Sequence, residues 1–203
     1  AFRSGTDIHA ATAAKIWHVP VEEVTPEQRK KAKQANFGII YGISTYGLAQ
    51  RMNISNSEAR QLIDDYFATF PRVKAYMDEA IATCREKGYA ETIYHRRRYL
   101  PDIASRNATV RGFAERNAIN APIQGSEADI IKVAMIHIFK RFATEGLRSR
   151  MILQVHDELN FSVYPEEREQ VERIVIEEME NACRLSIPLT ADAGWGANWL
   201  EAH

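Results

Sequence analysis

The stretch of sequence that decides the fold is TPEQRKKAKQANFGIIYG, residues 25–42. It predicts one helix with a defined start and end. Thr25 is a good N-cap residue, Pro26 suits the first helical position, and Gln28 has the spacing of a capping box. Gly42 is suited to ending the helix, because glycine readily adopts a positive φ.

A row of side chains runs along this predicted helix at every fourth residue, a spacing that keeps side chains on nearly one face. The row consists of two cations followed by two aromatic rings: Arg29, Lys33, Phe37 and Tyr41. Cations repel one another at this spacing, and they lie at the positive end of the helix dipole. Because the arrangement opposes local stability, it indicates a functional site.

The row matches the layout of a nucleoside triphosphate. Its two rings lie roughly 12 to 18 Å along the helix from Arg29. Cations at a helix N-terminus favour a polyanion, and rings further along suit a flat base. The spacing leaves an alternative open, in which a solvated basic face is followed by two core aromatic residues.

The row and its tail NFGIIYG, residues 36–42, resemble the nucleotide-binding helix of family A DNA polymerases, the group of bacterial DNA polymerase I. The resemblance extends from DIHAATA, residues 7–13, to NWLEAH, residues 198–203. The motifs are long and follow the order of the family, so the match is specific. It implies template-directed transfer of a nucleotidyl group from a dNTP to a primer 3′-hydroxyl, with primer–template DNA as the partner.

The resemblance also implies a role for each residue of the row. Arg29 and Lys33 would hold the triphosphate, and Lys33 would also act in catalysis at the leaving pyrophosphate. Phe37 would pack on the sugar and base. Tyr41 would close the insertion site beside the template, in contact with DNA. His9, within DIHAATA, matches a nucleotide-binding position that approaches the incoming triphosphate.

Two strand-like runs, MILQV and LNFSV, flank a short acidic segment. His156 and Asp157 can form a hairpin turn, since Asp tolerates unusual backbone angles. A carboxylate on a rigid turn suits Mg²⁺, which proteins often hold through one or two carboxylates, and it suits two-metal phosphoryl transfer. A solvated turn is the alternative. The resemblance implies that Asp157 is a catalytic magnesium ligand, that His156 contacts DNA near the primer terminus, and that Glu158 is a second possible ligand.

A polar stripe follows the same four-residue spacing on a long helix expected over residues 110–144. Its members are Arg116, Asn120 and Gln124. Amide and guanidinium donors suit the acceptors that every base pair presents in the minor groove. An exposed polar helix face is the alternative. The segment RNAINAPIQG, residues 116–125, resembles the segment with which the family reads the minor groove, which implies DNA binding by these three side chains.

Charge is distributed unevenly along the chain. Residues 1–116 hold 18 lysines and arginines against 13 acids, whereas residues 117–203 hold 8 against 14. A basic half joined to an acidic half suits a phosphate-rich partner with metal between them. Several arginines are suited to backbone phosphates, which give affinity without sequence specificity: Arg96, Arg97, Arg98, Arg106 and Arg111.

The remaining pattern predicts an α+β fold. Besides the helices above, we expect helices over 7–17, 58–70 (preceded by Ser57), 72–87 and 166–185. We also expect a hairpin or loop over 89–99, a strand over 189–193, and a kink at Pro122 and Gly125. By the resemblance, this is an incomplete polymerase domain. A mainly helical fingers subdomain would span residues 1–105, and the C-terminal part of an antiparallel-sheet palm subdomain would span residues 106–203.

The family's first catalytic motif, which resembles DYSQIELR and carries a second metal-binding Asp, does not occur in the 203 residues. We therefore expect the N-terminal part of the same polypeptide as a partner, and we predict that the isolated chain does not polymerise. The alternative function is a non-catalytic helical nucleic-acid-binding module, in which the acidic segment is only a turn.

The composition of the chain indicates in which cellular compartment the protein is expected. No apolar run reaches membrane-spanning length and no signal-peptide pattern opens the sequence, so no membrane partner is expected. The two cysteines, Cys84 and Cys183, are far apart. Lone cysteines fit a reducing cytoplasm better than a disulfide framework or a zinc site.

Overall fold

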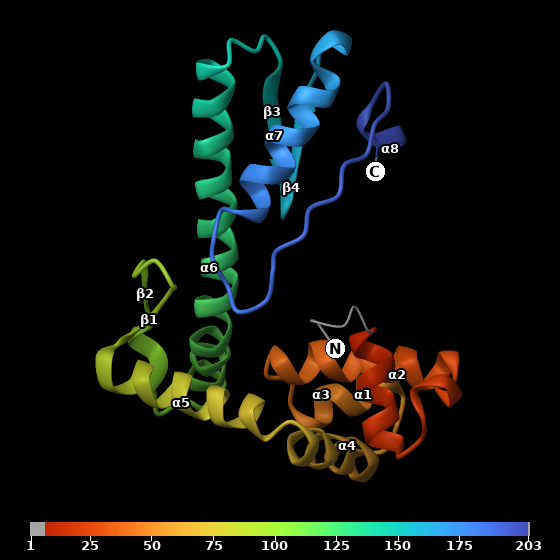
Figure 1. The fold of residues 1–203 in the computed structure, drawn as a ribbon. Coiled ribbons are helices and arrows are strands. Elements are labelled where there is room, and N and C mark those ends of the chain that lie inside the picture. The colour runs from red at the N-terminus through yellow and green to blue at the C-terminus, as the bar shows by residue number, and fades with distance from the viewer. Residues whose placement is uncertain (1–6, 203) are drawn as a thin grey trace. The chain divides into compact units, whose positions relative to one another are not determined.

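The computed structural model describes residues 7–202 and confirms the α+β class (Figure 1). His203, the last residue of the NWLEAH motif, lies outside the described residues. The longer helices are α1 Ile8–Trp17, α2 Pro26–Ile40, α3 Thr45–Met52, α4 Asn56–Thr69, α5 Pro71–Lys87, α6 Ala108–Thr144 and α7 Arg168–Glu180. The strands are β1 Tyr89–Glu91, β2 Arg97–Tyr99, β3 Arg150–Val155 and β4 Glu158–Ser162. Short helices complete the set: η2 Val21–Glu23, η3 Pro101–Ala104, η4 Pro165–Glu167 and α8 Trp199–Ala202.

The chain divides into two compact units, one up to Ile123 and one from Gln124 onward. Helix α6 contributes its first part to one unit and the rest to the other. It is a continuous α-helix through Pro122, so the proline does not end it. The subdomain boundary between residues 105 and 106 concerns function and stays a prediction.

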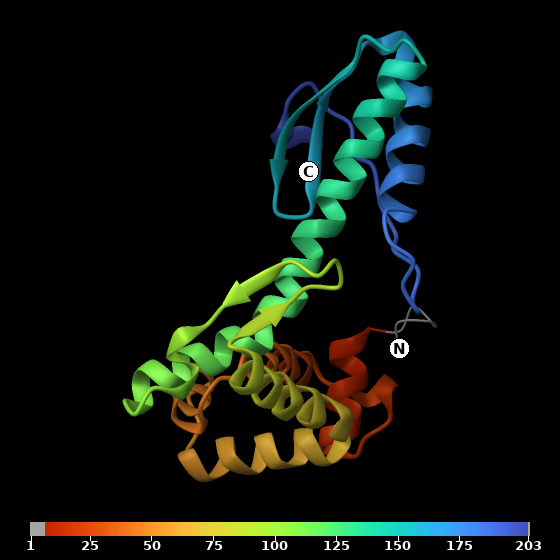
Figure 2. The same cartoon turned by 90° about the vertical axis from the view of Figure 1, so that its left-hand side faces the viewer.

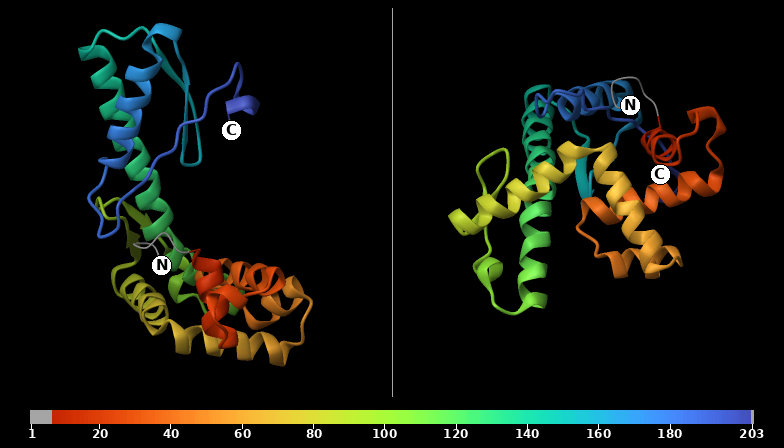
Figure 3. Two further views of the ribbon diagram at one scale, coloured as in Figure 1. Left: turned by 45° about the vertical axis from the view of Figure 1, so that its right-hand side comes forward. Right: turned by 90° about the horizontal axis from the view of Figure 1, so that it is seen from below.

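The first unit contains a helical core around α2. Helices α1 and α2 lie side by side (Figure 3), and α3 and α4 complete the core. The small side chains of Ala32 and Ala35 are fully buried on α2, and Leu48 of α3 is fully buried beside them. Burying small residues on one face of α2 lets its neighbours approach closely and leaves the opposite face to solvent.

Helix α2 begins and ends as the sequence predicts. The Thr25 backbone N–H donates to Gln28 Oε1 over 2.9 Å, and the Gln28 N–H donates to Thr25 Oγ1 over 3.2 Å. Gly42 has a φ of +74° just after the helix. The first turn also contains Glu27, which pairs with Lys31 over 2.9 Å and offsets part of the positive charge.

Helices α3 and α4 begin where no helix start was predicted, and α7 is shorter than the predicted range 166–185. Helix α3 was not expected, and it begins after Ser44, whose hydroxyl accepts from the Gly47 N–H over 3.1 Å. Helix α4 begins after Ser55 and not after Ser57 as expected, because Ser55 forms a capping box with Glu58. Serine three residues before Glu is the local signal for this start.

A second core of the first unit joins α5, the β1–β2 hairpin and the start of α6. The hairpin follows α5 (Figure 2). It pairs Tyr89 with Tyr99, so of the two predicted alternatives over residues 89–99 the segment forms the hairpin and not a loop. Cys84 of α5 and Ala118 of α6 are both buried in this core. The Tyr76 hydroxyl donates to the Ile119 carbonyl over 2.9 Å, which joins α5 to α6.

The second unit packs the β3–β4 hairpin against α6 and α7. Ile138 of α6 and Ile174 of α7 are fully buried at the centre of its core, with Phe161 of β4 packed against them. The strand expected over residues 189–193 is wrong, because that segment is irregular. Within the described residues, the sheet of this unit is two-stranded, so the segment has no strand partner.

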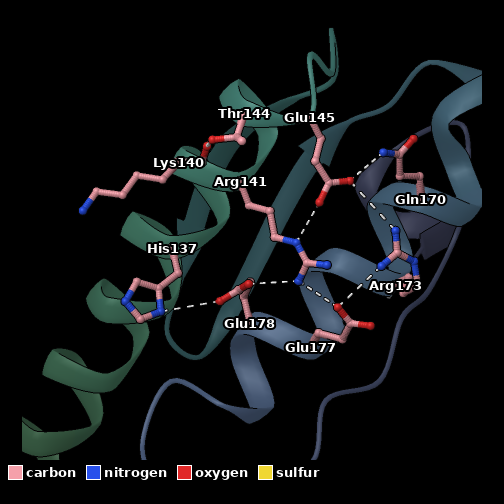
Figure 4. A network of polar contacts seen from close by, with 9 residues as sticks. All are labelled: His137, Lys140, Arg141, Thr144, Glu145, Gln170, Arg173, Glu177 and Glu178. Atoms are coloured by element: carbon pink, nitrogen blue, oxygen red, sulfur yellow. Dashed lines mark hydrogen bonds and ion pairs between the residues drawn. The ribbon is translucent and has the colours of Figure 1, made fainter.

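Polar contacts tie α6 to α7 in the second unit. Figure 4 shows Arg141 of α6 between Glu145, which directly follows α6, and two acids of α7. Its guanidinium contacts Glu145, Glu177 and Glu178 over 2.9, 2.7 and 2.9 Å, which raises its pKa. Several acids around one cation hold the two helices in register.

Among residues 7–202, no helix has the length and apolar character needed to cross a membrane.

Candidate functional site

The row of cations and rings on α2 faces solvent. Arg29 and Lys33 are exposed, and the exposed fractions of Phe37 and Tyr41 are 46% and 44%. The interpretation of the two rings as core aromatic residues is therefore wrong. The opposite face carries the buried residues, among them Ile39.

The aromatic end of the row forms a continuous surface. The rings of Phe37 and Tyr41 lie 6.5 Å apart between centroids, with 9° between their planes. On the other side of Phe37, the ring of His9 lies 5.7 Å away at a tilt of 48°. Helix α1 thus places His9 next to α2, beside the part of the row between Lys33 and Phe37.

The contacts of His9 define its tautomer. Thr12 donates its hydroxyl hydrogen to the Ile8 carbonyl over 2.7 Å, so its oxygen is left to accept. Asn36 Nδ2 donates to that oxygen over 3.1 Å and lies 3.0 Å from His9 Nδ1. Because this amide nitrogen can only donate, Nδ1 accepts and the ring proton lies on Nε2.

Electrostatics also favour the neutral form of His9. Burial lowers its pKa, and the charges of Lys33 and Arg29 lower it further, while Asp7 opposes them. A neutral imidazole therefore presents an Nε2–H donor beside the cations of α2. A donor in that place is suited to a phosphate oxygen.

Arg29 makes an ion pair that the sequence analysis did not predict. Its Nε lies 2.7 Å from Asp7 Oδ2. The sequence indicates Asp7 only as the start of a helix. No local pattern reveals the pair, because the partners are separated by 22 positions in the chain.

A cavity of about 440 Å³ opens at the tyrosine end of the row. It brings together α2, the segment between α2 and α3, Arg51 near the end of α3, and Arg116 from α6. Its lining contains residues that the sequence analysis missed, in addition to Phe37, Tyr41, Gly42 and Arg116: Gly38, Ile43, Ser44 and Arg51. A Cβ on Gly42 would lie 3.0 Å from Arg116 Cγ, so Arg116 lies against the glycine that ends α2. The sequence had not linked Arg116 to this row.

The other members of the polar stripe are distributed along α6. Asn120 is half-buried in the first unit, and Gln124 is exposed at the start of the second. Their DNA contacts stay a prediction.

Two of the arginines expected to contact phosphates make contacts within the protein. Arg111 donates from Nη1 to the Ser105 carbonyl over 2.9 Å, which fixes the turn before α6. Arg97 pairs with Glu91 over 3.1 Å and lies 4.5 Å from the ring centroid of Tyr89. These contacts show a structural role for both side chains, and their phosphate contacts stay a prediction.

The acidic segment forms the turn of the β3–β4 hairpin. Val155 pairs with Glu158, so His156 and Asp157 are the two turn residues, as predicted. The unusual backbone angle lies at His156, with φ of +52°, and not at Asp157 as expected. The Gln154 side-chain amide donates to the His156 carbonyl, which braces the turn. Asp157 is exposed at its tip.

The chemistry of the turn suits a hard cation only in part. The Asp157 carboxylate is exposed, whereas Glu158 is half-buried and accepts a hydrogen bond from Trp199 Nε1 over 2.6 Å. Within residues 7–202, no three His, Cys, Asp or Glu side chains lie together as a metal-binding group. Magnesium needs only one or two protein carboxylates besides substrate phosphates and water, so Asp157 fits as one ligand of a shared site.

Comparison with known proteins gives the following matches. The model of the family described as DNA polymerase family A matches residues 1–201. The chain is 54% identical to DNA polymerase I of Geobacillus stearothermophilus and 48% identical to that of Bacillus subtilis, covering 100% of this chain and 23% of each relative. The chain thus spans about a quarter of the length of these relatives.

A solved structure matches the whole chain as well. It is described as the POL domain of Pol1 from M. smegmatis in complex with DNA primer-template and dNTP. The TM-score is 0.94 and the sequence identity is 47%, and the match covers 100% of this chain and 36% of that chain.

Proposed function

Since the chain belongs to DNA polymerase family A, we propose that it supplies the nucleotide-binding part of a DNA-directed DNA polymerase. The observation that carries this proposal is the exposed row on α2, with cations at its start, stacked rings at its end and His9 beside it. Such a row matches a dNTP in charge and in shape. The relative solved with primer-template and dNTP supports the same partners.

The reaction would proceed by positioning and by electrostatic stabilisation. Arg29 and Lys33 hold the triphosphate and offset the charge that develops on the leaving pyrophosphate. Lys33 also has a proton to give to that pyrophosphate. The neutral imidazole of His9 donates from Nε2 to a phosphate oxygen. Phe37 packs on the sugar and base, and Tyr41 closes the cavity beside the template base.

Magnesium is the cofactor that fits the proposed reaction. Asp157 would hold it, with Glu158 as a possible second ligand once Trp199 releases its carboxylate. Bound magnesium would polarise the phosphate oxygens and stabilise the attacking and leaving oxygens. Among the described residues, no three potential ligand side chains lie together, so we propose that the second carboxylate of the site comes from the N-terminal part of the same polypeptide.

The nucleic-acid partner is primer–template DNA. Arg116, Asn120 and Gln124 would donate to minor-groove acceptors, which are present in every base pair. This contact would test pair geometry without reading sequence. Arg111 would support it at the backbone, and His156 would lie near the primer terminus.

The test is primer extension by the polymerase that contains this chain. Asp157→Ala should lower turnover by a factor of about a hundred or more, since metal ions supply several kcal/mol of transition-state stabilisation, and primer–template affinity should stay the same. Asp192→Ala is the matched control, because Asp192 is also an exposed acid of the second unit. If Asp157→Ala extends primers like the control, a non-catalytic nucleic-acid-binding module becomes the better explanation.

The isolated chain provides a second test. Without the other metal-binding Asp, the 203 residues should show no extension. Metal-dependent extension near the rate of an intact polymerase would refute the proposal that a carboxylate is supplied from elsewhere.

A further inference from the structure

The carboxylate of Asp7 joins the starts of two helices. Its Oδ1 accepts from the backbone N–H groups of His9 and Ala10 over 2.8 and 3.1 Å, which makes Asp7 the N-cap of α1. Its Oδ2 accepts from Arg29 Nε of α2 over 2.7 Å. Because α1 fixes one oxygen, the other is a fixed acceptor for the guanidinium.

The ion pair uses one edge of the guanidinium. In the described part of the chain, Asp7 contacts Arg29 only through Nε. A guanidinium has five N–H donors in a rigid plane, four of them on its terminal nitrogens. With Nε held by Asp7, the terminal nitrogens retain their donors for another acceptor, and the plane loses rotational freedom. Arg29 is also exposed, so an acceptor from solvent can reach it.

We propose that Asp7 is a positioning residue, which holds the Arg29 guanidinium so that its terminal nitrogens face the triphosphate of the incoming nucleotide. This inference rests on the function proposed for α2. It extends that function to an acidic residue in a site where the ligand is an anion.

Charge alone predicts the opposite effect. A carboxylate near a triphosphate repels it, so removal of the negative charge should strengthen nucleotide binding. Asp7 stays ionised at neutral pH, because the Ala10 N–H, then Arg29, lower its pKa to about 2. A positioning role predicts weaker binding when the charge is removed. The sign of the change therefore separates the two explanations.

The test is Asp7→Asn in the polymerase that contains this chain. Asparagine is as good an N-cap residue as aspartate, so α1 keeps its start while the charge-assisted bond to Arg29 is lost. In primer extension, we expect the KM for dNTP to rise about fivefold, a typical coupling for a close charged pair. The KM for primer–template should stay the same, while the thermal midpoint of unfolding should fall slightly, because the negative charge at the start of α1 is lost. Asp7→Ser also keeps a good N-cap residue without the charge, so it should raise the KM for dNTP as Asp7→Asn does.

A double-mutant cycle with Arg29→Gln assigns the effect. If Asp7 acts through Arg29, Asp7→Asn should not change the KM for dNTP in the Arg29→Gln background. Inorganic tripolyphosphate, as a competitor of dNTP, should lose affinity in Asp7→Asn by the same factor. An unchanged or lower KM for dNTP in Asp7→Asn, or an equal loss in the Arg29→Gln background, would overturn the inference.

The same cycle separates this inference from the proposed function. If Arg29→Gln raises the KM for dNTP and Asp7→Asn does not, only the role of Asp7 is wrong. If Arg29→Gln leaves nucleotide use unchanged, the role of α2 is wrong, and the inference is wrong with it.

Discussion

The rings of Phe37 and Tyr41 stack one turn apart on the solvent face of α2, with 6.5 Å between centroids and 9° between planes. Neither ring is covered by the core, although burying an aromatic side chain is strongly favourable. Two parallel rings held in solvent beside a cavity present flat apolar surface to a ligand. This geometry supports a base and a sugar as the groups bound at this end of the row.

Phe37 is predicted to control the choice of sugar. The family resemblance implies that Phe at this position accompanies rejection of nucleotides without a 3′-hydroxyl, and Tyr their acceptance. Phe37→Tyr should therefore raise the relative use of dideoxynucleotides about tenfold or more, as a polar partner compensates for a missing hydroxyl. The measurement is the ratio of kcat/KM for dideoxynucleotide and deoxynucleotide. Tyr41→Phe is the matched control and should leave the ratio unchanged, whereas an unchanged ratio in Phe37→Tyr contradicts the assignment.

Gly42 is predicted to be required for the position of the Arg116 side chain. Gly42→Ala imposes a side chain at φ of +74° and puts a Cβ 3.0 Å from Arg116 Cγ. The backbone strain should cost about 1 kcal/mol of unfolding free energy, and displacement of Arg116 should weaken primer–template use. Denaturant unfolding and the KM for primer–template measure the two effects.

Gly88→Ala is the control for that prediction. Gly88 has a similar φ of +79°, and a Cβ there would meet no atom within 4 Å. It should lose stability through the same backbone strain and keep its KM for primer–template. Equal KM values in the two variants would show that Arg116 does not depend on Gly42.

His9 is predicted to make stability depend on pH. Burial lowers its folded-state pKa below the ordinary value of 6.5. As pH falls below 6.5, the unfolded chain binds a proton on His9 before the folded chain does, so the free energy of unfolding decreases. The contribution is complete above pH 6.5 and is lost as pH falls toward the folded-state pKa.

The measurement is denaturant unfolding of the chain at several pH values around 6.5, compared with His9→Gln. The variant cannot titrate, so its stability should fall less between high and low pH. Parallel pH profiles for the two proteins would contradict the neutral, Nε2-protonated form assigned to His9.

Local features of the chain were predictable from sequence. The capping box of Thr25 and Gln28, the end at Gly42 and the turn at His156 and Asp157 involve residues close in sequence. Their backbone geometry follows from side-chain chemistry at fixed spacing. The four-residue spacing also predicted that the row lies on one face of α2, but it left open whether the two rings are exposed.

Features that depend on distant partners were not predictable. The pair of Asp7 and Arg29, and the contact of Arg116 with Gly42, arise only when separate helices pack. The error at residues 189–193 has the same origin, because a short strand-like segment forms a strand only beside another strand. Helix α3 was missed since its eight residues are fewer than the window over which helical periodicity is read.

The central claim is that the cations of α2 bind the triphosphate and not the DNA backbone. Lys33 and Lys30 are both exposed on α2, and only Lys33 belongs to the row. The most direct measurement compares Lys33→Ala with Lys30→Ala in the polymerase that contains this chain. Lys33→Ala should raise the KM for dNTP about tenfold or more, the effect of a lost charge-assisted contact, with unchanged primer–template affinity, and Lys30→Ala should change neither. Weaker primer–template binding with an unchanged KM for dNTP in Lys33→Ala would contradict the account.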